Sequence, residues 1–290
     1  MKSWQIAEIL LLAALWGGSF LFMRIAAPEL GPIWLIEFRV LIAGLTLLPL
    51  LIHQGHLSHT RRHWRSLGVV GLLNSALPFS LLAFTSLSLP AGTTAILNST
   101  VPFFGVAVAY IWLQEQLTRS RLLGLLLGFT GVVVLVGLRD TALTPNILGA
   151  IATGLCAALM YAIAAPFIRL NLTGVPPIVI ATGSQLSAAI LLLPLLPFTQ
   201  PSQVPSTQAL FSILGLALLS TSLAYILYFR LIHAVGSTQA LTVTYLIPLF
   251  AILWGTLILG EAITPSMVAG GTLILLGTAI ANQVIKLPIR

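Results

Sequence analysis

The stretch YLIPLFAILWGTLILGEAIT, residues 245–264, has a proline inside an apolar segment that is long enough to cross a lipid bilayer. The stretch STVPFFGVAVAYIWLQEQLT, residues 99–118, has the same pattern. The matching residues are 146 positions apart, as in Pro102 and Pro248 (248 − 102), Glu115 and Glu261, and Thr118 and Thr264. A segment that recurs at a fixed offset indicates two copies of one structural unit.

The amino-acid composition requires a lipid environment. Of the 290 residues, 58% are hydrophobic and 7% are charged, whereas soluble proteins carry about 25% charged residues. The chain has too few polar residues to cover a soluble fold of this size. The net charge of +7 comes from basic residues scattered between apolar segments, with no basic face for nucleic acid. The single cysteine, Cys156, excludes an intrachain disulfide.

Ten apolar segments are long enough to cross a bilayer as helices, which takes about 20 residues each. They span residues 5–25, 31–52, 67–87, 91–113, 121–138, 147–168, 176–197, 209–231, 236–259 and 265–285. They do not alternate apolar with polar residues, as the strands of a membrane β-barrel would. The N-terminus resembles a signal peptide, but Glu8 interrupts its apolar region, and we interpret it as an uncleaved first span. The sequence thus predicts an all-α integral membrane protein.

The distribution of lysine and arginine predicts the orientation, because basic residues accumulate in cytoplasmic loops. With a cytoplasmic N-terminus, ten basic residues lie on that side, namely Lys2, Arg61, Arg62, Arg65, Arg119, Arg121, Arg169, Arg230, Lys286 and Arg290. Only Arg24 and Arg139 lie on the other side, and Arg39 lies within the second span. We therefore expect a multi-pass protein of the cytoplasmic (inner) membrane, with both termini cytoplasmic.

The offset between the two copies covers five predicted spans, which is an odd number. The second copy therefore enters the membrane from the opposite side, and the two halves form an inverted repeat. We expect residues 1–140 to hold helices one to five and residues 145–290 to hold helices six to ten. Inverted repeats are common in secondary transporters, where they expose a midplane site to each side in turn. A duplicated scaffold without transport is the alternative interpretation.

The fifth predicted helix carries the motif Gly124-x-x-x-Gly128, followed by Gly131. Gly124 and Gly131 match Gly270 and Gly277 at the same offset of 146 (270 − 124). Glycines at this spacing let two helices approach closely. The motif fits packing within one chain as well as between two copies, so both a monomer and a homodimer are compatible with it.

The stretch LWGGSFLFMRIAAPELGPIWLIEFRVLIAGLTLLPLL, residues 15–51, resembles the drug/metabolite transporter superfamily, as do the two Pro…Glu helices that each precede a threonine and a glycine-rich span. The chain looks most like exporters built from two EamA-type domains, over nearly its whole length. The resemblance implies that helices one to four and six to nine surround a central cavity, with helices five and ten at the periphery. The second half lacks a counterpart of Arg39, since the aligned region holds Gly183, Ser184 and Gln185.

Three charged residues within the predicted spans are candidates for function, because each costs at least about 2.5–3.5 kcal/mol in the bilayer. Glu37 and Arg39 are two residues apart and project about 200° from each other, so each needs its own partner. Arg39 matches an arginine that recurs in the resembled family; it could attract a carboxylate or bond structurally to helix carbonyl groups. Glu37 and Glu8 are candidates for proton coupling. The alternatives are an interfacial position for Glu37 and snorkelling to the cytoplasmic face for Glu8.

The residues after each repeated helix predict a short turn. Glu115 and Glu261 precede Thr118 and Thr264 by three residues, and threonine is a good N-cap for the next helix. A carboxylate near a helix N-terminus is stabilised by the helix dipole. Because these residues occur in both halves, on opposite sides of the membrane, we expect their role to be structural.

A proline within a span kinks the helix and frees a carbonyl group, so we interpret Pro102 and Pro248 as kinks in the wall of a cavity. A packing kink without ligand contact is the alternative. Polar and aromatic residues of other spans could line the same cavity. These substrate-binding candidates are Trp16, Ser19, Arg39, Asn74, Asn98, Tyr161, Gln185, Ser222, Tyr225, Thr244 and Tyr245. Such a pocket would suit small amphipathic metabolites or amino acids, although each residue alone is also explained by helix packing.

The sequence lacks the HExxH, GxSxG and Walker A motifs of enzymes and ATP-driven pumps. The histidines His53, His56, His59 and His63 could form a metal site, but a loop facing lipid headgroups is the simpler interpretation. We predict a secondary transporter that exports a small-molecule substrate by alternating access, with no enzymatic activity, metal or cofactor. An intramembrane enzyme acting on a lipid or lipid-linked substrate and a non-transporting scaffold are the alternatives.

Overall fold

The computed structural model describes residues 3–137, 144–201, 204–236, 240, 242–282 and 284–285, and every regular element in these residues is helical. Eight segments are long and apolar enough to cross a membrane: α1 (Ser3–Leu30), α2 (Pro32–His53), α4 to α5 (Trp64–Ser88), α6 to α7 (Ala91–Leu113), α8 (Arg119–Gly137), α9 (Pro145–Asn171), α10 with its 3-10 extension (Pro177–Phe198), and α11 to α12 (Thr207–Val235). Two shorter apolar helices follow, α14 (Val243–Leu259) and α15 (Pro265–Ala281). Together these segments occupy the ten predicted spans and confirm the all-α membrane fold.

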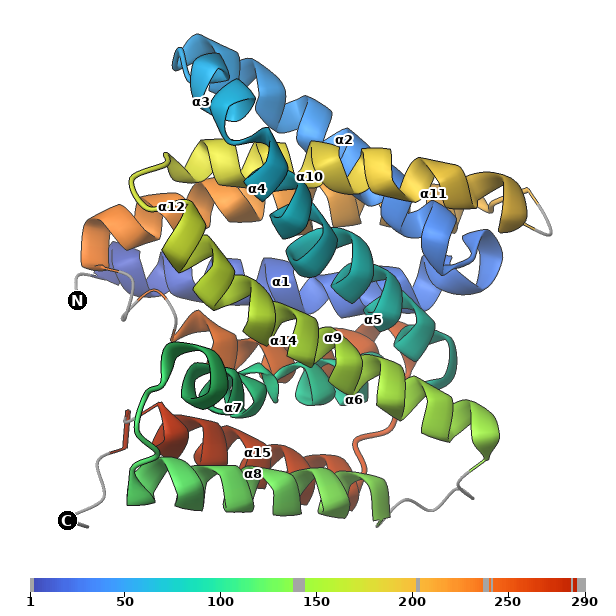
Figure 1. Ribbon diagram of the computed structural model, residues 1–290. Coiled ribbons are helices and arrows are strands. Elements are labelled where there is room, and N and C mark those ends of the chain that lie inside the picture. Colours follow the sequence, from blue (N-terminus) through green and yellow to red (C-terminus); the bar gives the residue numbers. More distant parts are fainter. Residues whose placement is uncertain are drawn as a thin grey trace.

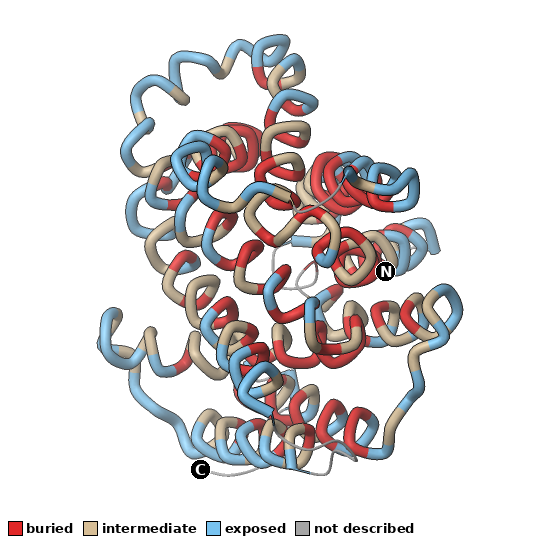
Figure 2. The backbone as a smooth tube through the Cα atoms, turned by 90° about the vertical axis from the view of Figure 1, so that its right-hand side faces the viewer, coloured by how far each residue is buried: buried red, intermediate tan, exposed pale blue. Residues whose placement is uncertain are grey.

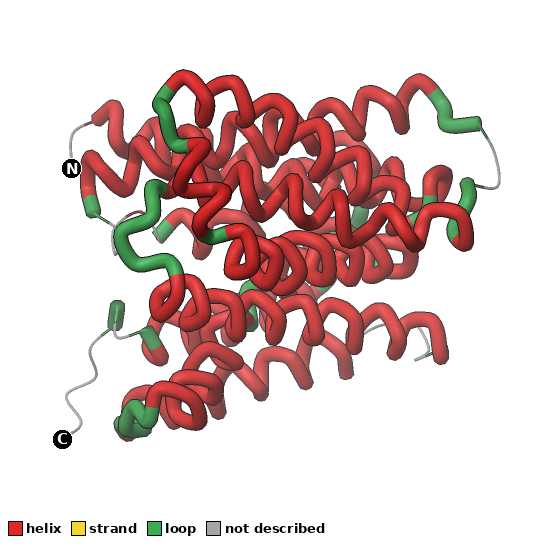
Figure 3. The backbone as a smooth tube through the Cα atoms, turned by 45° about the horizontal axis from the view of Figure 1, so that its top comes forward, coloured by secondary structure: helices red, strands yellow, loops and turns green. Residues whose placement is uncertain are grey.

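The helices lie side by side, most of them roughly along one direction and some tilted across it, with α8 and α15 paired at one edge (Figure 1). The short helix α3 (Leu57–Arg62) connects α2 to α4 and is exposed. Short loops join most of the helices (Figure 3), and the buried residues gather where helices meet (Figure 2). Large apolar side chains cover the outer surface, among them Phe129 and Phe211, each 69% exposed. Such a surface suits lipid, not water.

The first helix is longer than the predicted span 5–25. It continues through Pro28, where the sequence predicts a break, and ends at Leu30, just before Gly31, whose φ of +75° favours glycine. Proline removes only one backbone hydrogen bond, and the preceding Ala26 and Ala27 are held in the main apolar core. The stabilisation gained by burying this turn therefore outweighs the cost of the proline.

The two repeated proline helices differ in the structure. Between α6 (Ala91–Asn98) and α7 (Val101–Leu113) the helix is interrupted at Ser99 and Thr100, and Pro102 occupies the first turn of α7, where proline is tolerated. Pro248 instead lies buried within α14. The two halves thus place the same proline in different local structure.

The third span of each half contains a π-helical segment. These segments are η1 (Leu72–Ala76), between α4 and α5, and η3 (Gly215–Leu223), between α11 and α12. At the offset of 146, residues 72–76 correspond to residues 218–222, which lie within η3. The widened helix is therefore a feature of both repeats. π-helical turns inside α-helices are often found at functional sites.

The described basic residues are divided between the two ends of the helices. Arg121 and Arg169 both contact Glu115 at one end, whereas Arg24 contacts Glu261 at the other. Four other basic residues that were used to predict the orientation, Lys2, Arg139, Lys286 and Arg290, lie outside the described residues.

Glycines bring α8 and α15 together with two-fold symmetry. A Cβ atom added to Gly124 would lie 2.6 Å from the Gly277 carbonyl oxygen, and one added to Gly131 would lie 2.8 Å from that of Gly270. Gly124 matches Gly270, and Gly131 matches Gly277. If the two repeats are exchanged, the contact between Gly124 and Gly277 therefore becomes the contact between Gly270 and Gly131. An antiparallel pair of this kind has a two-fold axis across the helices, as an inverted repeat requires. Both glycine pairs lie within one chain.

This packing predicts that Gly131→Ala lowers the stability of the protein by about 1–3 kcal/mol, because the added methyl group meets backbone atoms of α15 that cannot move aside. Gly149→Ala in α9 is the matched control, since a Cβ atom there meets open space. Thermal unfolding of the two variants in detergent measures the difference. Equal melting temperatures would contradict the packing.

Candidate functional site

The side chain of Arg39, on α2, is buried between elements of both repeats. Its Nε donates a hydrogen bond to Thr221 Oγ1 on η3 at 3.0 Å. Its guanidinium carbon lies 3.5 Å from the centre of the Phe79 ring on α5, which is a close cation–π contact. The part of the chain that the structure describes offers no acidic partner and no further hydrogen-bond acceptor to this guanidinium. Within the described residues, the positive charge therefore has no compensating negative one.

Two tyrosines extend the surroundings of Arg39. Tyr161 on α9 and Tyr225 on α12 lie near the arginine. The Tyr161 ring packs edge-on against Phe79, with 6.4 Å between ring centres. The side chain of Asn74, on η1, lies near that of Tyr225. Four of the residues predicted to bind substrate thus lie in one cluster with Phe79.

The π-helical segments supply more polar groups to this region. Gln185 on α10 donates through Nε2 to Ser75 Oγ at 3.0 Å, and its Oε1 is buried without a hydrogen-bond partner in the described chain. Ser222 Oγ donates to the Ala217 carbonyl at 3.0 Å. Asn74 and Ser75 lie on η1, and Thr221 and Ser222 on η3. We group Arg39 and the residues near it with the residues that lie beside or bond to these, and we call the set the arginine cluster; its members are Arg39, Asn74, Ser75, Phe79, Tyr161, Gln185, Thr221, Ser222 and Tyr225.

Other predicted site residues lie outside the arginine cluster. Trp16 packs against Tyr228, with ring centres 5.2 Å apart. Ser19 is buried in α1, and Asn98 lies at the end of α6 with Oδ1 lacking a partner among the described residues.

The two candidates on the ninth span are also separate from the cluster. Thr244 is exposed. Tyr245 accepts a hydrogen bond from Asn282 Nδ2 at 3.0 Å.

The two predicted proton-coupling residues have different environments. Glu37 is buried, and neither of its carboxylate oxygens has a hydrogen-bond partner in the described chain. Glu8 is also buried, but its Oε1 accepts a hydrogen bond from Arg230 Nε at 2.7 Å, which pairs its charge. Of the two carboxylates, only Glu37 has no counter-charge among the described residues.

The repeated turns have the same backbone in both halves. Gln114 and Gly260 both adopt the left-handed conformation, with φ of 54° and 66°. The residue after each of them donates a backbone hydrogen bond to a carbonyl group six residues earlier. These bonds run from Glu115 N–H to the Ala109 carbonyl and from Glu261 N–H to the Gly255 carbonyl. Both helices thus end at a left-handed residue, as helices commonly do.

The next helix begins in the same way in both halves. Thr118 Oγ1 accepts from Arg121 N–H, and Thr264 Oγ1 accepts from Met267 N–H. The two side chains therefore cap α8 and α15.

The carboxylates of the two turns have different partners. Glu261 accepts from Ala91 N–H at the start of α6 and pairs with Arg24. Burial raises the pKa of the Glu261 carboxyl, and the Ala91 hydrogen bond and Arg24 partly oppose this shift. Glu115 accepts from Arg121 at 3.0 Å.

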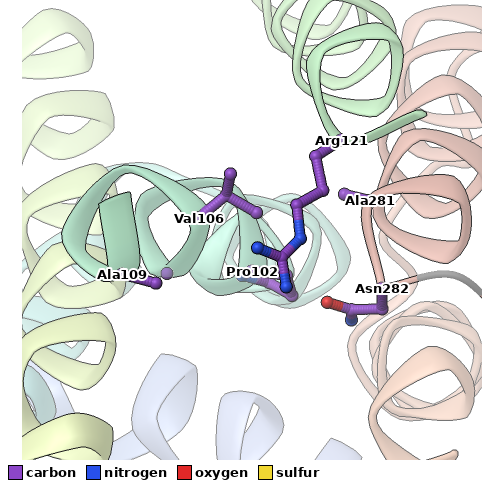
Figure 4. A pocket seen from close by; sticks show the side chains of 7 residues that line it. Pro102, Val106, Ala109, Arg121, Ala281 and Asn282 are labelled. Atoms are coloured by element: carbon purple, nitrogen blue, oxygen red, sulfur yellow. The ribbon is translucent and has the colours of Figure 1, made fainter. Parts of the chain in front are cut away.

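A cleft of about 310 Å³ opens between α7, α8 and α15, away from the arginine cluster (Figure 4). Its lining residues are Pro102, Gly105, Val106, Ala109, Arg121, Ala281 and Asn282. In the described chain, no group of three or more His, Cys, Asp or Glu side chains could hold a metal ion.

Comparison with known proteins shows the class of this protein. The EamA-like transporter family matches residues 3–137 and 148–283, so the chain belongs to this family of membrane transporters. An uncharacterized transporter of Archaeoglobus fulgidus is 27% identical over 280 residues, which are 96% of this chain and 97% of that protein. The uncharacterized inner membrane transporter YedA of Escherichia coli K12 is 25% identical over 256 residues, covering 86% and 81%. A protein of known crystal structure shares the fold with a TM-score of 0.66 at 19% identity, over 98% of both chains.

Sequence reasoning missed Phe79, Ser75 and Arg24. Phe79 is one of 13 phenylalanines, and nothing in its surroundings marks it as the ring beneath Arg39. Arg24 could have been found from the repeat. It stands eight residues before Pro32 (32 − 24), as Arg169 stands eight before Pro177 (177 − 169), and these prolines begin α2 and α10.

The arginine cluster predicts that Arg39→Lys lowers transport at least about tenfold, since loss of one charge-assisted hydrogen bond costs about 1.5–3 kcal/mol and 1.4 kcal/mol is a factor of ten. Lysine keeps the charge but loses the planar contact with Phe79 and the bond from Nε. Efflux from cells that produce the protein at equal levels measures the effect. Arg65→Lys is the control, because Arg65 also lies over an aromatic ring, at 5.3 Å from Trp64, but in an exposed position. Equal loss in both variants would contradict a specific role.

Proposed function

We propose that this membrane protein exports small metabolites that carry a carboxylate, such as amino acids, by alternating access. The observation that supports this most directly is the buried Arg39 guanidinium, which has no acidic partner among the described residues. A bound carboxylate would supply the missing negative charge, and guanidinium groups bind carboxylates in a bidentate geometry.

The rest of the arginine cluster suits the organic part of such a substrate. Tyr161 and Tyr225 offer aromatic surfaces with hydroxyl groups, and the unpartnered Gln185 Oε1 is an acceptor for an ammonium or hydroxyl group. Elements of both repeats contribute, so one chain is the functional unit of the proposal, whether or not two copies associate. Arg39 and Glu37 project from different sides of α2, which argues against an acid–base pair and hence against enzymatic chemistry.

We place the protein in the cytoplasmic membrane, with both termini cytoplasmic. The excess of basic residues on one side supports this orientation. The resemblance to YedA, an inner membrane transporter by name, supports the compartment.

Glu37 is the group that we assign to proton coupling. An ionised carboxylate that is buried without a partner costs several kcal/mol. Such a group suits a protein that takes up a proton in one conformation and releases it in another. Glu8 is less suited, because Arg230 already balances its charge.

Counterflow in proteoliposomes tests the proposed function. Vesicles loaded with an unlabelled amino acid should accumulate the labelled form of the same compound, and the corresponding amine without a carboxylate should not exchange. Wild-type protein and Arg39→Gln are compared, with protein-free vesicles as the blank. Exchange of the amine at the same rate as the acid would refute the carboxylate assignment. Absence of exchange across a broad panel of carboxylates, beside an active exporter, would refute the function.

The coupling assignment predicts that Glu37→Gln abolishes the effect of a pH gradient on net transport and leaves counterflow within about twofold of wild type. Glutamine has the shape of the protonated glutamate but cannot release a proton. Glu8→Gln is the control and should keep the response to the gradient. The same gradient response in Glu37→Gln as in wild type would exclude Glu37 as the coupling group.

A further inference from the structure

Among the described residues, three ion pairs link the two repeats, and the repeat relates two of them to each other. Arg24 Nε lies 3.5 Å from Glu261 Oε1, and Arg169 Nη1 lies 3.8 Å from Glu115 Oε1. Arg24 and Arg169 occupy matching positions before α2 and α10, and Glu115 matches Glu261. Each pair joins an arginine of one repeat to a glutamate of the other. The chain therefore contains the same contact twice. In one copy the first repeat supplies the arginine, and in the other copy the second repeat supplies it.

The two pairs lie at opposite ends of the helices. The link from α7 to α8, which carries Glu115, and the link from α14 to α15, which carries Glu261, are on opposite sides in Figure 1. We call these the Glu115 end and the Glu261 end. In a membrane-spanning protein they face the two different compartments.

The Glu261 end is tightly connected. Ala91 N–H, at the start of α6, donates to both carboxylate oxygens of Glu261, at 3.2 and 2.9 Å. Arg24 Nη1 donates to the carbonyl oxygens of Ser86 and Leu87, in the last turn of α5, at 2.7 and 3.0 Å. One arginine and one glutamate thus hold the end of α5 and the start of α6, in the first repeat, against the turn of the second.

Close packing also joins these helices between this end and their middle. A Cβ atom added to Gly92 would lie 2.6 Å from Ile252 and 2.7 Å from Met267, and one added to Gly17 would lie 2.9 Å from the Ala251 nitrogen. The Trp254 indole N–H donates to the Ala14 carbonyl at 3.0 Å. The helix α14 is therefore in direct contact with α1 and α6.

At the Glu115 end the matching arginine and glutamate are loosely arranged, although Glu8 of the first repeat pairs with Arg230 of the second toward this end, at 2.7 Å. The Arg169 side chain is 74% exposed, and the closest bond of Glu115 is to Arg121 of its own repeat. The cleft of Figure 4 lies beside α7, lined by Val106 and Ala109. These residues match Ile252 and Gly255 at the offset of 146 (252 − 106), which are packed at the other end. The same structural unit is closed at one end and open at the other.

We propose that the Arg24–Glu261 and Arg169–Glu115 pairs are reciprocal gates, of which only one is closed at a time. The structure then shows the state in which the Glu261 gate is closed. In the opposite state, Arg169 leaves solvent and binds the carbonyl groups of His233 and Ala234, which stand in the last turn of α12 as Ser86 and Leu87 stand in that of α5. In that state Glu115 no longer bonds to Arg121 and pairs closely with Arg169, and the ion pair between Arg24 and Glu261 is broken. This rests on the proposed alternating access, but not on the identity of the substrate.

Distances between spin labels at matched positions test the gates. Cys156 is the only cysteine, so labels are placed on a Cys156→Ser background. One pair, Leu87→Cys with Ile263→Cys, reports the Glu261 end, and a second pair, Ala234→Cys with Leu117→Cys, reports the Glu115 end. Leu117 matches Ile263 at the offset of 146, and Ala234, like Leu87, is the last residue but one of its helix. All four positions are exposed in the structure. Pulsed electron paramagnetic resonance in lipid nanodiscs, without substrate, then gives the populations of short and long distances at each end.

Glu261→Gln should add a long distance at the Glu261 end and a short distance at the Glu115 end, with the ratio of the two states shifted about tenfold or more from wild type. Arg169→Gln should leave the wild-type distribution in place or sharpen it, because it weakens the gate that is already open. Glu29→Gln is the control. Glu29 binds Ser206 N–H and Oγ, and its counterpart in the other repeat is Gly174 (174 − 145), so it belongs to no matched pair.

A change at the Glu261 end with no change at the Glu115 end would overturn reciprocity. The same shift in Glu29→Gln as in Glu261→Gln, or a shift of Arg169→Gln in the direction of Glu261→Gln, would overturn the assignment of these pairs. The counterflow experiment is independent of these readings. If the spin-label distances change reciprocally but no carboxylate is exchanged, the gates stand and the proposed substrate is refuted. If carboxylates are exchanged but the distances do not change reciprocally, the substrate stands and the gates are refuted.

Discussion

A buried arginine that has no acidic partner among the described residues is the constraint on which the interior of this protein depends. The bilayer makes the Arg39 charge costly, and the structure stabilises it with the Phe79 ring and one hydrogen bond to Thr221. These groups lie on helices of both repeats. Neither half alone could therefore hold the charge, which ties the assembly of the two halves to the candidate site.

Backbone irregularities occur where the polar groups are needed. A membrane-spanning helix must satisfy its own backbone hydrogen bonds, so a widened or interrupted turn has to be buried in protein or face a cavity. Both π-helical segments carry residues of the arginine cluster, Asn74 and Ser75 on η1 and Thr221 and Ser222 on η3. The Thr221 and Ser222 hydroxyls donate to carbonyl groups five residues back, those of Leu216 and Ala217. The same turns that relax the helix thus orient its polar side chains.

The features that could be predicted from the sequence are those that depend on composition and on repetition. Hydropathy located all ten spans, and the shared offset indicated the two repeats, because these signals are summed over many residues. The arginine cluster was predicted only in part, since Arg39, Asn74, Tyr161 and Gln185 are polar residues at depth, whereas Phe79 is an apolar residue among apolar residues. Its role arises from the packing of α2 against α5, which no local pattern records. Tyr245, although part of the stretch that revealed the repeat, contacts Asn282 outside the cluster.

The repeated turn shows why a symmetric sequence gives an asymmetric structure. The backbone of the turn is nearly identical in both halves, down to the left-handed residue and the threonine cap. Its glutamate nevertheless meets a helix N-terminus in one half and a neighbouring arginine in the other. Local sequence therefore specifies the turn but not its partner, which depends on how the two repeats are tilted against each other. If the tilt reversed, the inverted relation of the halves would give each glutamate the surroundings that the other now has. The conformation of the second repeat in one state of such a protein is therefore the conformation that the first repeat adopts in the opposite state.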